Sequence, residues 1–227
     1  MTIVSANGLS GFFDKSGRLV VPPRYHQVDV FSEGLAGVCI DNKWGYINRS
    51  GQEVIPLEFD GVGVFKGGLA TMLRNGKTGF IDKTGRIAIP NRYRWCQPFS
   101  EGLAAVETQN LWGFIDPRGR EIVPPKYNNF RAFTEGLAMV SLNGKNGYID
   151  KTGRLIIPIQ YTMAGSFSEG LAAVSTGDRI GFIDRTGKLV IPYKYEQVGL
   201  FADGLVPVML GDKMGYIDRK GTEYWKD

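Results

Sequence analysis

The sequence predicts an all-β protein made of tandem copies of one short unit, and three observations lead to this fold class. A motif of the form G-[FY]-x-[DN]-x-x-G, such as GYIDKTG at Gly147, returns every 34 residues without an insertion. The apolar runs between turn residues are five to seven residues long and rich in β-branched and aromatic side chains, as strands are. No stretch is long enough for the apolar spacing that helical repeats of the same period need. The seven copies begin at Gly11, Gly45, Gly79, Gly113, Gly147, Gly181 and Gly215.

Each unit is expected to hold three strands, and the copy at 137–170 shows them in order. The first is LAMVSLN (Leu137–Asn143), the second is NGYID (Asn146–Asp150) and the third is RLIIP (Arg154–Pro158). Together they predict a three-stranded antiparallel meander. A proline is expected to end the third strand, because the loss of an N–H is tolerated there. The segment Tyr161–Gly170 then crosses back and begins the next meander.

The turns between these strands carry residues with a specific backbone chemistry. Asn143-Gly144 is the pair typical of a two-residue hairpin turn. In the turn Asp150–Gly153, the aspartate can accept hydrogen bonds from the turn amides, and glycine adopts the positive φ that other residues resist. The seven turns pair Asp14 with Gly17, Asn48 with Gly51, Asp82 with Gly85, Asp116 with Gly119, Asp150 with Gly153, Asp184 with Gly187 and Asp218 with Gly221.

Both faces of each small sheet are expected to be buried, because neighbours along one strand, such as Tyr148 and Ile149, are both apolar. A single three-stranded sheet is only marginally stable in water. We therefore expect each sheet to stack face to face on the next, about 10 Å apart. Aromatic residues such as Tyr161 and Phe167 would fill the seam between them.

Two arrangements of the stacked sheets follow from this pattern. The first is an open β-solenoid-like superhelix, and the alternative is a closed, seven-bladed propeller-like ring. Phe12 and Tyr216 stand in the terminal copies where a solenoid would carry polar caps, which favours the ring. Three strands in 34 residues are few for a propeller blade, which favours the open array, our expectation. The chain is expected to form one domain of repeats 1–34, 35–68, 69–102, 103–136, 137–170, 171–204 and a partial repeat 205–227.

Composition and charge argue against several classes of partner. The net charge of +4 comes from Lys and Arg placed mostly in turns and forms no dense basic stripe, so no nucleic-acid partner is expected. No apolar run is long enough to span a membrane, and the first residues lack the features of a signal peptide, so we expect a cytoplasmic protein. Cys39 and Cys96 occupy different positions of the unit and are expected to be free thiols.

Several stretches resemble a known family. KWGYINRSGQEVIP (Lys43–Pro56), LWGFIDPRGREIVP (Leu111–Pro124) and the linking FSEGLAAV are similar to the bacterial WG-repeat, or KWG-repeat, family along practically the whole chain. The resemblance implies a β-rich repeat protein of variable copy number and implies no catalytic residues. The tryptophan for which the family is named is present at Trp44 and Trp112. The equivalent positions of four of the other five copies hold Thr78, Asn146, Ile180 and Met214.

No catalytic, cofactor or metal site is expected. Calcium needs six to eight oxygen ligands, whereas each turn motif offers one carboxylate. His26 is the single histidine and there is no CxxC spacing, so a transition-metal site is not expected either. The repeated acidic residues are interpreted as part of a tight S-E-G bend rather than as the carboxylate pair of a glycosidase. These acidic residues are Glu33, Glu101, Glu135, Glu169 and Asp203.

The copies differ most in the segment that returns to the next meander. Divergence there places a varied surface on a constant scaffold, and Trp and Arg are over-represented at the centres of protein interfaces. A purely structural alternative for Trp95 is that it fills a gap beside Cys96. Trp44 and Trp112, at the hairpins, form a second candidate set. The candidate partner-binding residues are Arg92, Arg94, Trp95, Asn129, Arg131, Trp44 and Trp112.

These observations favour a non-enzymatic scaffold that recognises a protein, for example a bacterial inhibitor or immunity partner that holds a toxin or effector. The alternative is a multivalent carbohydrate-binding repeat protein. That function needs equivalent exposed aromatic residues in most copies, and only positions such as Tyr25 recur in this way. Because these tyrosines are expected to be buried, protein recognition is the preferred hypothesis.

Overall fold

In the computed structural model, which describes residues 1–225, every regular element is a β-strand, so the predicted all-β class is confirmed. The chain divides into two compact units. The first comprises Met1–Gln109 with Ile115–Arg120, and the second comprises Asn110–Phe114 with the chain from Glu121 onward. The assignment of the whole chain to a single array stays a prediction.

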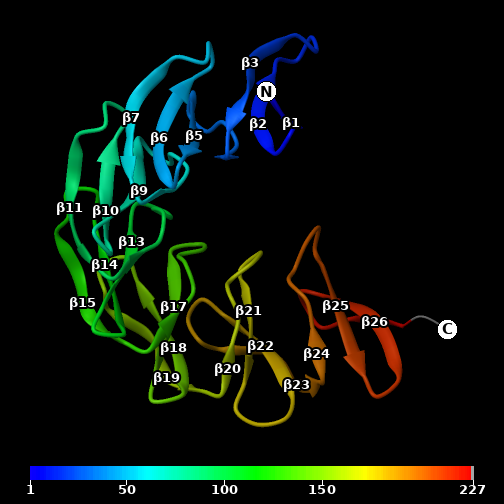
Figure 1. The fold of residues 1–227 in the computed structure, drawn as a ribbon. Helices are drawn as coiled ribbons and strands as arrows, with labels where there is room; N and C mark the ends of the chain where they lie inside the picture. Colours follow the sequence, from blue (N-terminus) through cyan, green and yellow to red (C-terminus); the bar gives the residue numbers. More distant parts are fainter. Residues whose placement is uncertain (226–227) are drawn as a thin grey trace. The chain divides into compact units, whose positions relative to one another are not determined.

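The first unit is built from small antiparallel sheets that follow one another along the chain (Figure 1). It begins with the three-stranded sheet β1-β2-β3 and continues with the four-stranded sheets β4-β5-β6-β7 and β8-β9-β10-β11, followed by the pair β12-β13. The strands are β1 (Thr2–Ala6), β2 (Leu9–Phe13), β3 (Leu19–Tyr25), β4 (Gln27–Val28), β5 (Leu35–Ile40), β6 (Lys43–Asn48), β7 (Glu53–Phe59), β8 (Gly61–Val62), β9 (Leu69–Arg74), β10 (Lys77–Asp82), β11 (Ile87–Tyr93), β12 (Trp95–Cys96) and β13 (Ala104–Thr108).

The second unit repeats the four-stranded pattern. Its complete sheets are β16-β17-β18-β19, β20-β21-β22-β23 and β24-β25-β26-β27. Its strands are most of β14 (Leu111–Ile115), β15 (Glu121–Tyr127), β16 (Asn129–Phe130), β17 (Leu137–Leu142), β18 (Lys145–Asp150), β19 (Leu155–Tyr161), β20 (Met163–Ala164), β21 (Leu171–Ser175), β22 (Ile180–Asp184), β23 (Leu189–Tyr195), β24 (Gln197–Val198), β25 (Leu205–Leu210), β26 (Lys213–Asp218) and β27 (Glu223–Trp225).

The returning segment contributes a fourth strand that the sequence pattern does not predict. In β20, Met163 pairs with Ser175 and Ala164 pairs with Val174 of the following repeat. Two residues are too few to show the alternation by which a strand is recognised. Each four-stranded sheet therefore joins the end of one 34-residue copy to the three strands of the next.

The third strand does not end at its proline, which corrects the expectation from the sequence. β19 continues to Tyr161, and Pro158 lies in a bulge where the register shifts between Asn146 and Tyr148 of the neighbouring strand. A residue in a bulge is released from the ladder, so its missing N–H carries no cost there. Opposite this bulge lies Gly147, where an added Cβ would stand 2.6 Å from the carbonyl oxygen of Ile157.

The expected stacking of sheets is visible in the packing of neighbouring residues on one strand. Phe182 of β22 belongs to a core with Phe201 of its own repeat and Ile217 of the following repeat. Ile183, the next residue, belongs to a different core with Tyr148 of the preceding repeat. One strand thus contributes to two cores on opposite faces of its sheet, as the apolar neighbours along each strand predict.

The seam also holds the aromatic residues assigned to it. Tyr161 and Phe167 are each 3% exposed, and the rings of Tyr148 and Phe167 lie 4.9 Å apart in an edge-to-face arrangement. Such pairs contribute beyond the apolar area that they bury.

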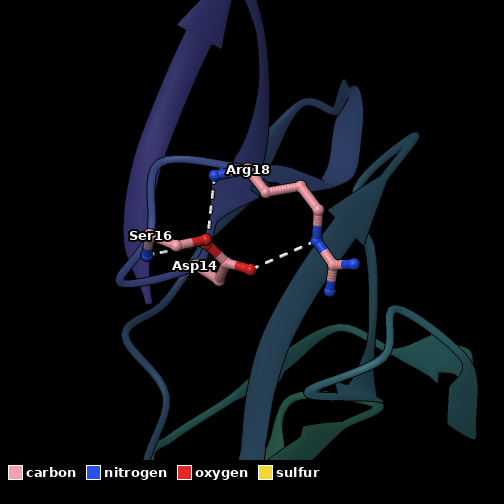
Figure 2. Close-up of polar contacts among 3 residues, drawn as sticks. All are labelled: Asp14, Ser16 and Arg18. Atoms are coloured by element: carbon pink, nitrogen blue, oxygen red, sulfur yellow. Dashed lines mark hydrogen bonds and ion pairs between the residues drawn. The ribbon is translucent and has the colours of Figure 1, made fainter.

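The turn that closes the second hairpin has the predicted chemistry, and Figure 2 shows its first copy. Asp14 Oδ1 accepts hydrogen bonds from the backbone amides of Ser16, at 2.9 Å, and Arg18, at 3.0 Å. The Ser16 hydroxyl donates to the same oxygen at 2.6 Å. These bonds, the Ser16 hydroxyl first, hold the pKa of Asp14 below its ordinary value. Gly17 has a φ of +81°, so the expectation that this glycine takes a positive φ is confirmed.

We expect Gly153→Val to lower the free energy of unfolding by about 1–2 kcal/mol or more, because a β-branched residue is strained at positive φ. Gly153 has a φ of +84°, and an added Cβ would also lie 2.8 Å from Cγ2 of Val123. Gly17→Val is the matched comparison, because a Cβ at Gly17 meets nothing within 4 Å and its cost reflects φ alone. Thermal unfolding of both variants measures the two contributions. Unchanged melting of Gly153→Val would show that the turn tolerates a branched residue.

Candidate functional site

The structure distributes the candidate partner-binding residues over the two units. Arg92, Arg94 and Trp95 belong to the first unit, and Asn129 and Arg131 belong to the second. Trp95 is the first residue of the two-residue strand β12 and pairs with Glu107 in the backbone register. It is 52% exposed. Single exposed apolar side chains are common on protein surfaces, and what singles out Trp95 is that Trp is over-represented at the centres of protein interfaces.

The two arginines beside Trp95 have defined partners. Arg92 donates from Nη2 to the hydroxyl of Tyr93 at 2.8 Å, and its guanidinium lies over the same ring. Arg94 forms an ion pair with Glu107, with 3.4 Å between Nη1 and Oε1. The Arg94 side chain is 63% exposed, so this pair contributes little to stability and leaves the guanidinium accessible.

In the second unit, Asn129 and Arg131 lie on and directly after the short strand β16. Asn129 Oδ1 accepts a hydrogen bond from the amide of Phe130 at 2.8 Å, and the amide of Arg131 donates to Met139 O at 2.9 Å. Both side chains are exposed. Their position in the repeat is therefore the same as that of Trp95 and the residues around it.

The two tryptophans at the hairpins are partly buried. Trp44 packs against the core that contains Phe59 and Phe65, together with Val62. The Trp112 ring lies 4.6 Å from the ring of Phe130. The Trp112 indole thus covers Phe130, the second residue of the short strand contributed by its own copy.

A pocket of about 180 Å³ opens in the first unit at Thr78, in one of the copies that lack this tryptophan. Thr78 occupies the position and is 6% exposed, and its hydroxyl donates to the carbonyl oxygen of Arg94 at 3.2 Å. Trp95 stands at the edge of the pocket and Cys96 lines it. The lining residues are Gly61, Val62, Thr71, Met72, Leu73, Thr78, Trp95 and Cys96. Sequence reasoning noticed the exchange of Trp for Thr78 but not the hollow that it leaves.

The acidic bend has the predicted geometry and a further role that the sequence analysis missed. Ser32 and Leu35 exchange both backbone hydrogen bonds, and Glu33 has a φ of +50°. Its carboxylate accepts hydrogen bonds from the amides of Gly67, at 2.6 Å, and Gly68, at 3.1 Å, in the equivalent bend of the next copy. Positive φ favours Asn or Gly, yet this bend holds a glutamate. The choice of glutamate in such a bend is the signal that its carboxylate makes a contact.

The same contact between consecutive bends recurs in the second unit. Glu135 accepts from the amide of Gly170 at 2.9 Å, and Glu169 accepts from the amide of Gly204 at 3.0 Å.

In the first unit, the Glu33 carboxylate also contacts Lys83, with 2.9 Å between Nζ and Oε2. This contact is the largest influence that holds the pKa of Glu33 below its ordinary value, and the amides of Gly67 and Gly68 act in the same direction. These carboxylates are therefore engaged in joining one copy to the next.

Within residues 1–225, no group of three or more His, Cys, Asp and Glu side chains is placed to hold a metal ion. The same part of the chain has no helix that is long and apolar enough to cross a membrane. Burial raises the pKa of the Cys96 thiol to about 12, so this pocket thiol is protonated at neutral pH and is a weak nucleophile.

A family model described as WG containing repeat matches the chain six times, at residues 11–44, 44–77, 79–112, 112–145, 147–179 and 180–213. The chain belongs to the WG-repeat family. This confirms the resemblance carried by the KWG and LWG stretches. A sequence comparison with curated proteins finds no match for this WG-repeat protein.

Solved structures show what the fold is similar to. The crystal structure of a eukaryotic initiation factor is 13% identical, covers 97% of this chain and 71% of its own, and has a TM-score of 0.61. BamB from Moraxella catarrhalis is 11% identical, covers 98% of this chain and 83% of its own, and has a TM-score of 0.51. Both are propeller-like proteins, and at these identities the likeness shows the fold alone.

Proposed function

We propose that this WG-repeat protein is a non-enzymatic scaffold that recognises a protein partner through its returning segments, with Trp95 as the principal contact. The observation that carries the proposal is the 52% exposed indole of Trp95 at the edge of a pocket, on a strand held in the same register as its counterparts. Aromatic side chains with this exposure are characteristic anchors of protein interfaces.

Comparison of the copies supports this role. The residue that begins the short strand is exposed or half-buried in every copy, whereas the ladder around it is constant. The scaffold therefore accepts side chains as different as those of Gly61, Trp95 and Asn129 there, which leaves the position open to selection by a partner. The equivalent residues are Gln27, Gly61, Trp95, Asn129, Met163 and Gln197.

A more specific form of the proposal is an inhibitor or immunity protein that holds a toxin or effector in the cytoplasm. Cys39 and Cys96, both buried and unbridged, support a reducing compartment. A toxin encoded by the neighbouring gene would support this form. Carbohydrate binding has less support, because the recurring Tyr25, Tyr93 and Tyr195 are each at most 2% exposed and offer no platform for a sugar.

We expect Trp95→Ala to weaken binding of the partner by about 2 kcal/mol or more, as the loss of a central aromatic anchor does. The partner is first captured from an extract of the source cells on the immobilised wild-type protein. Its affinity for each purified variant is then measured by titration calorimetry. Arg94→Ala and Arg131→Ala should have smaller effects, because these exposed charges lie where water screens them.

Two variants control for this experiment. Ile87→Ala removes a side chain that is 49% exposed at the first residue of β11, an edge strand of the sheet β8-β9-β10-β11, which does not contain Trp95, and should leave the affinity unchanged. Lys151→Ala alters a turn between the second and third strands and should also have no effect. Circular dichroism must show that Trp95→Ala is folded. Full affinity of a folded Trp95→Ala protein would refute the proposed contact and direct attention to Trp44 and Trp112.

A further inference from the structure

We propose that the pocket beside Trp95 binds a single neutral aromatic side chain of the protein partner, flanked in the partner by acidic residues. The pocket is defined by its lining residues Gly61, Val62, Thr71, Met72, Leu73, Thr78, Trp95 and Cys96. The inference rests on the proposed function and specifies the chemistry of the partner at this point.

The first argument is that the pocket lies where another copy of the same unit holds an indole. Trp44 pairs with Cys39 and Phe59 in the backbone register, and Trp44 and Val62 both pack against the core that contains Phe59 and Phe65. Thr78 has the same register one copy later, opposite Leu73 and Tyr93.

The residue that would contact such an indole is also smaller in this copy. Cys96 stands where the preceding copy has Val62 and the following copy has Phe130. Two reductions in size at adjoining positions leave the space of an aromatic ring vacant, and the half-exposed Trp95 borders this space. A second pocket, of about 220 Å³, opens in the other unit at Met214, which also replaces the tryptophan.

The second argument is the chemistry of the lining. Val62 and Leu73 provide apolar walls, and Trp95 provides a ring against which a second ring can pack. The hydroxyls of Thr71 and Thr78 can accept a hydrogen bond from an indole N–H. A cavity of about 150 Å³ in another protein binds benzene, so the 180 Å³ found here has room for one ring.

The third argument is electrostatic and concerns what surrounds the pocket. No carboxylate, ammonium or guanidinium group lines it, so a charged side chain that entered would lose hydration without compensation. The rim carries the exposed Arg94, whose carbonyl oxygen accepts from Thr78. Arg92 and Arg74 lie on the neighbouring strands β11 and β9. Arg94 is paired with Glu107 and Arg74 with Glu58, so three arginines and two glutamates leave one positive charge in excess. An aromatic residue between acidic residues complements this arrangement.

The experiment uses the full chain and short peptides. Acetyl-Asp-Trp-Asp-amide is titrated into the ¹⁵N-labelled protein, and the amide signals of Leu73, Thr78 and Cys96 and the indole signal of Trp95 are followed by NMR. We expect saturable shifts with a Kd in the millimolar range, and at least tenfold weaker binding of acetyl-Asp-Ala-Asp-amide. Acetyl-Lys-Trp-Lys-amide should bind more weakly than the acidic peptide. Equal binding of the three peptides would overturn the proposal, as would the absence of saturable shifts.

Two variants fill the pocket with residues that other copies already hold. Thr78→Trp restores the residue of Trp44, and Gly61→Gln restores the residue of Gln27 and Gln197 at a position where an added Cβ meets only ordinary contacts, 3.5 Å or more away. Each should reduce peptide binding at least tenfold, and Ile87→Ala should not change it. If one variant does not fold, the other provides the test. Folded variants that bind the peptide as the wild type does would contradict the proposal.

The affinities of the variants for the captured partner distinguish a failure of this proposal from a failure of the proposed function. If Trp95→Ala and Thr78→Trp both weaken partner binding, the pocket is a site of recognition. If only Trp95→Ala does so, the scaffold function stands and the pocket assignment is wrong. If neither variant changes the affinity, both proposals fail. Competition by acetyl-Asp-Trp-Asp-amide for the partner, and not by free indole alone, would identify a polypeptide as the occupant.

Discussion

Gly147→Ala is expected to lower the free energy of unfolding by about 3 kcal/mol or more, although it adds a single methyl group. The Cβ would lie 2.6 Å from the carbonyl oxygen of Ile157 and 2.8 Å from the amide nitrogen of Ile159. Both obstacles are backbone atoms of the adjacent strand, so relief requires β18 and β19 to separate and their hydrogen bonds to lengthen. Strain of this kind belongs to the small class of mutations with large effects. Equilibrium unfolding in urea, followed by circular dichroism, measures the loss.

Gly177→Ala is the matched control for this variant. It makes the same chemical change in the same unit, and an added Cβ at Gly177 meets nothing within 4 Å. Its φ also lies outside the left-handed region. The control should change the free energy of unfolding by no more than about 0.5 kcal/mol. Equal stabilities of the two variants would show that the close approach of β19 does not require a glycine at position 147.

Phe182→Ala is expected to cost about 3–5 kcal/mol, as the removal of a buried aromatic side chain does when its surroundings cannot close the cavity. Phe182 is 1% exposed, its ring lies 5.2 Å from that of Phe201, and it shares a core with Ile217 of the following repeat. The loss therefore weakens the contact between two sheets as well as one sheet itself. Urea unfolding provides the measurement.

Leu189→Ala, on the neighbouring strand β23, is the control for Phe182→Ala. Leu189 is 41% exposed, so its truncation should stay within about 0.5 kcal/mol of the wild type. A cost below about 1 kcal/mol for Phe182→Ala would mean that adjacent sheets are not held together by this core.

The parts of the fold that could be predicted are those encoded by neighbouring residues. Tyr148 and Ile149 are both apolar, which indicates two buried faces, and both are 0% exposed in the structure. Asp150 and Gly153 specify their turn through contacts within four residues. The short strand at Met163 could not be predicted in this way, because its pairing with Ser175 depends on a register that two residues do not encode.

The candidate site was predictable only in part, for a related reason. Comparison of the copies singled out Trp95, and its exposure agrees with a surface role that remains to be tested. The pocket beside it depends on Gly61, Thr78 and Cys96 from three different strands. Their adjacency follows from the sheet stacking and from side-chain volumes across it, which the sequence pattern does not contain. The choice between an open array and a closed ring stays a prediction.

The shared fourth strand has a consequence for how such a protein can change in length. Because β20 belongs by sequence to one copy and by hydrogen bonding to the sheet of the next, the structural module is offset from the sequence repeat. A duplication or deletion of 34 residues starting at any point still restores a complete sheet on each side of the junction, since the offset is the same in every copy. Gene rearrangement can therefore extend or shorten the protein without a privileged breakpoint, and each event adds or removes one variable surface position.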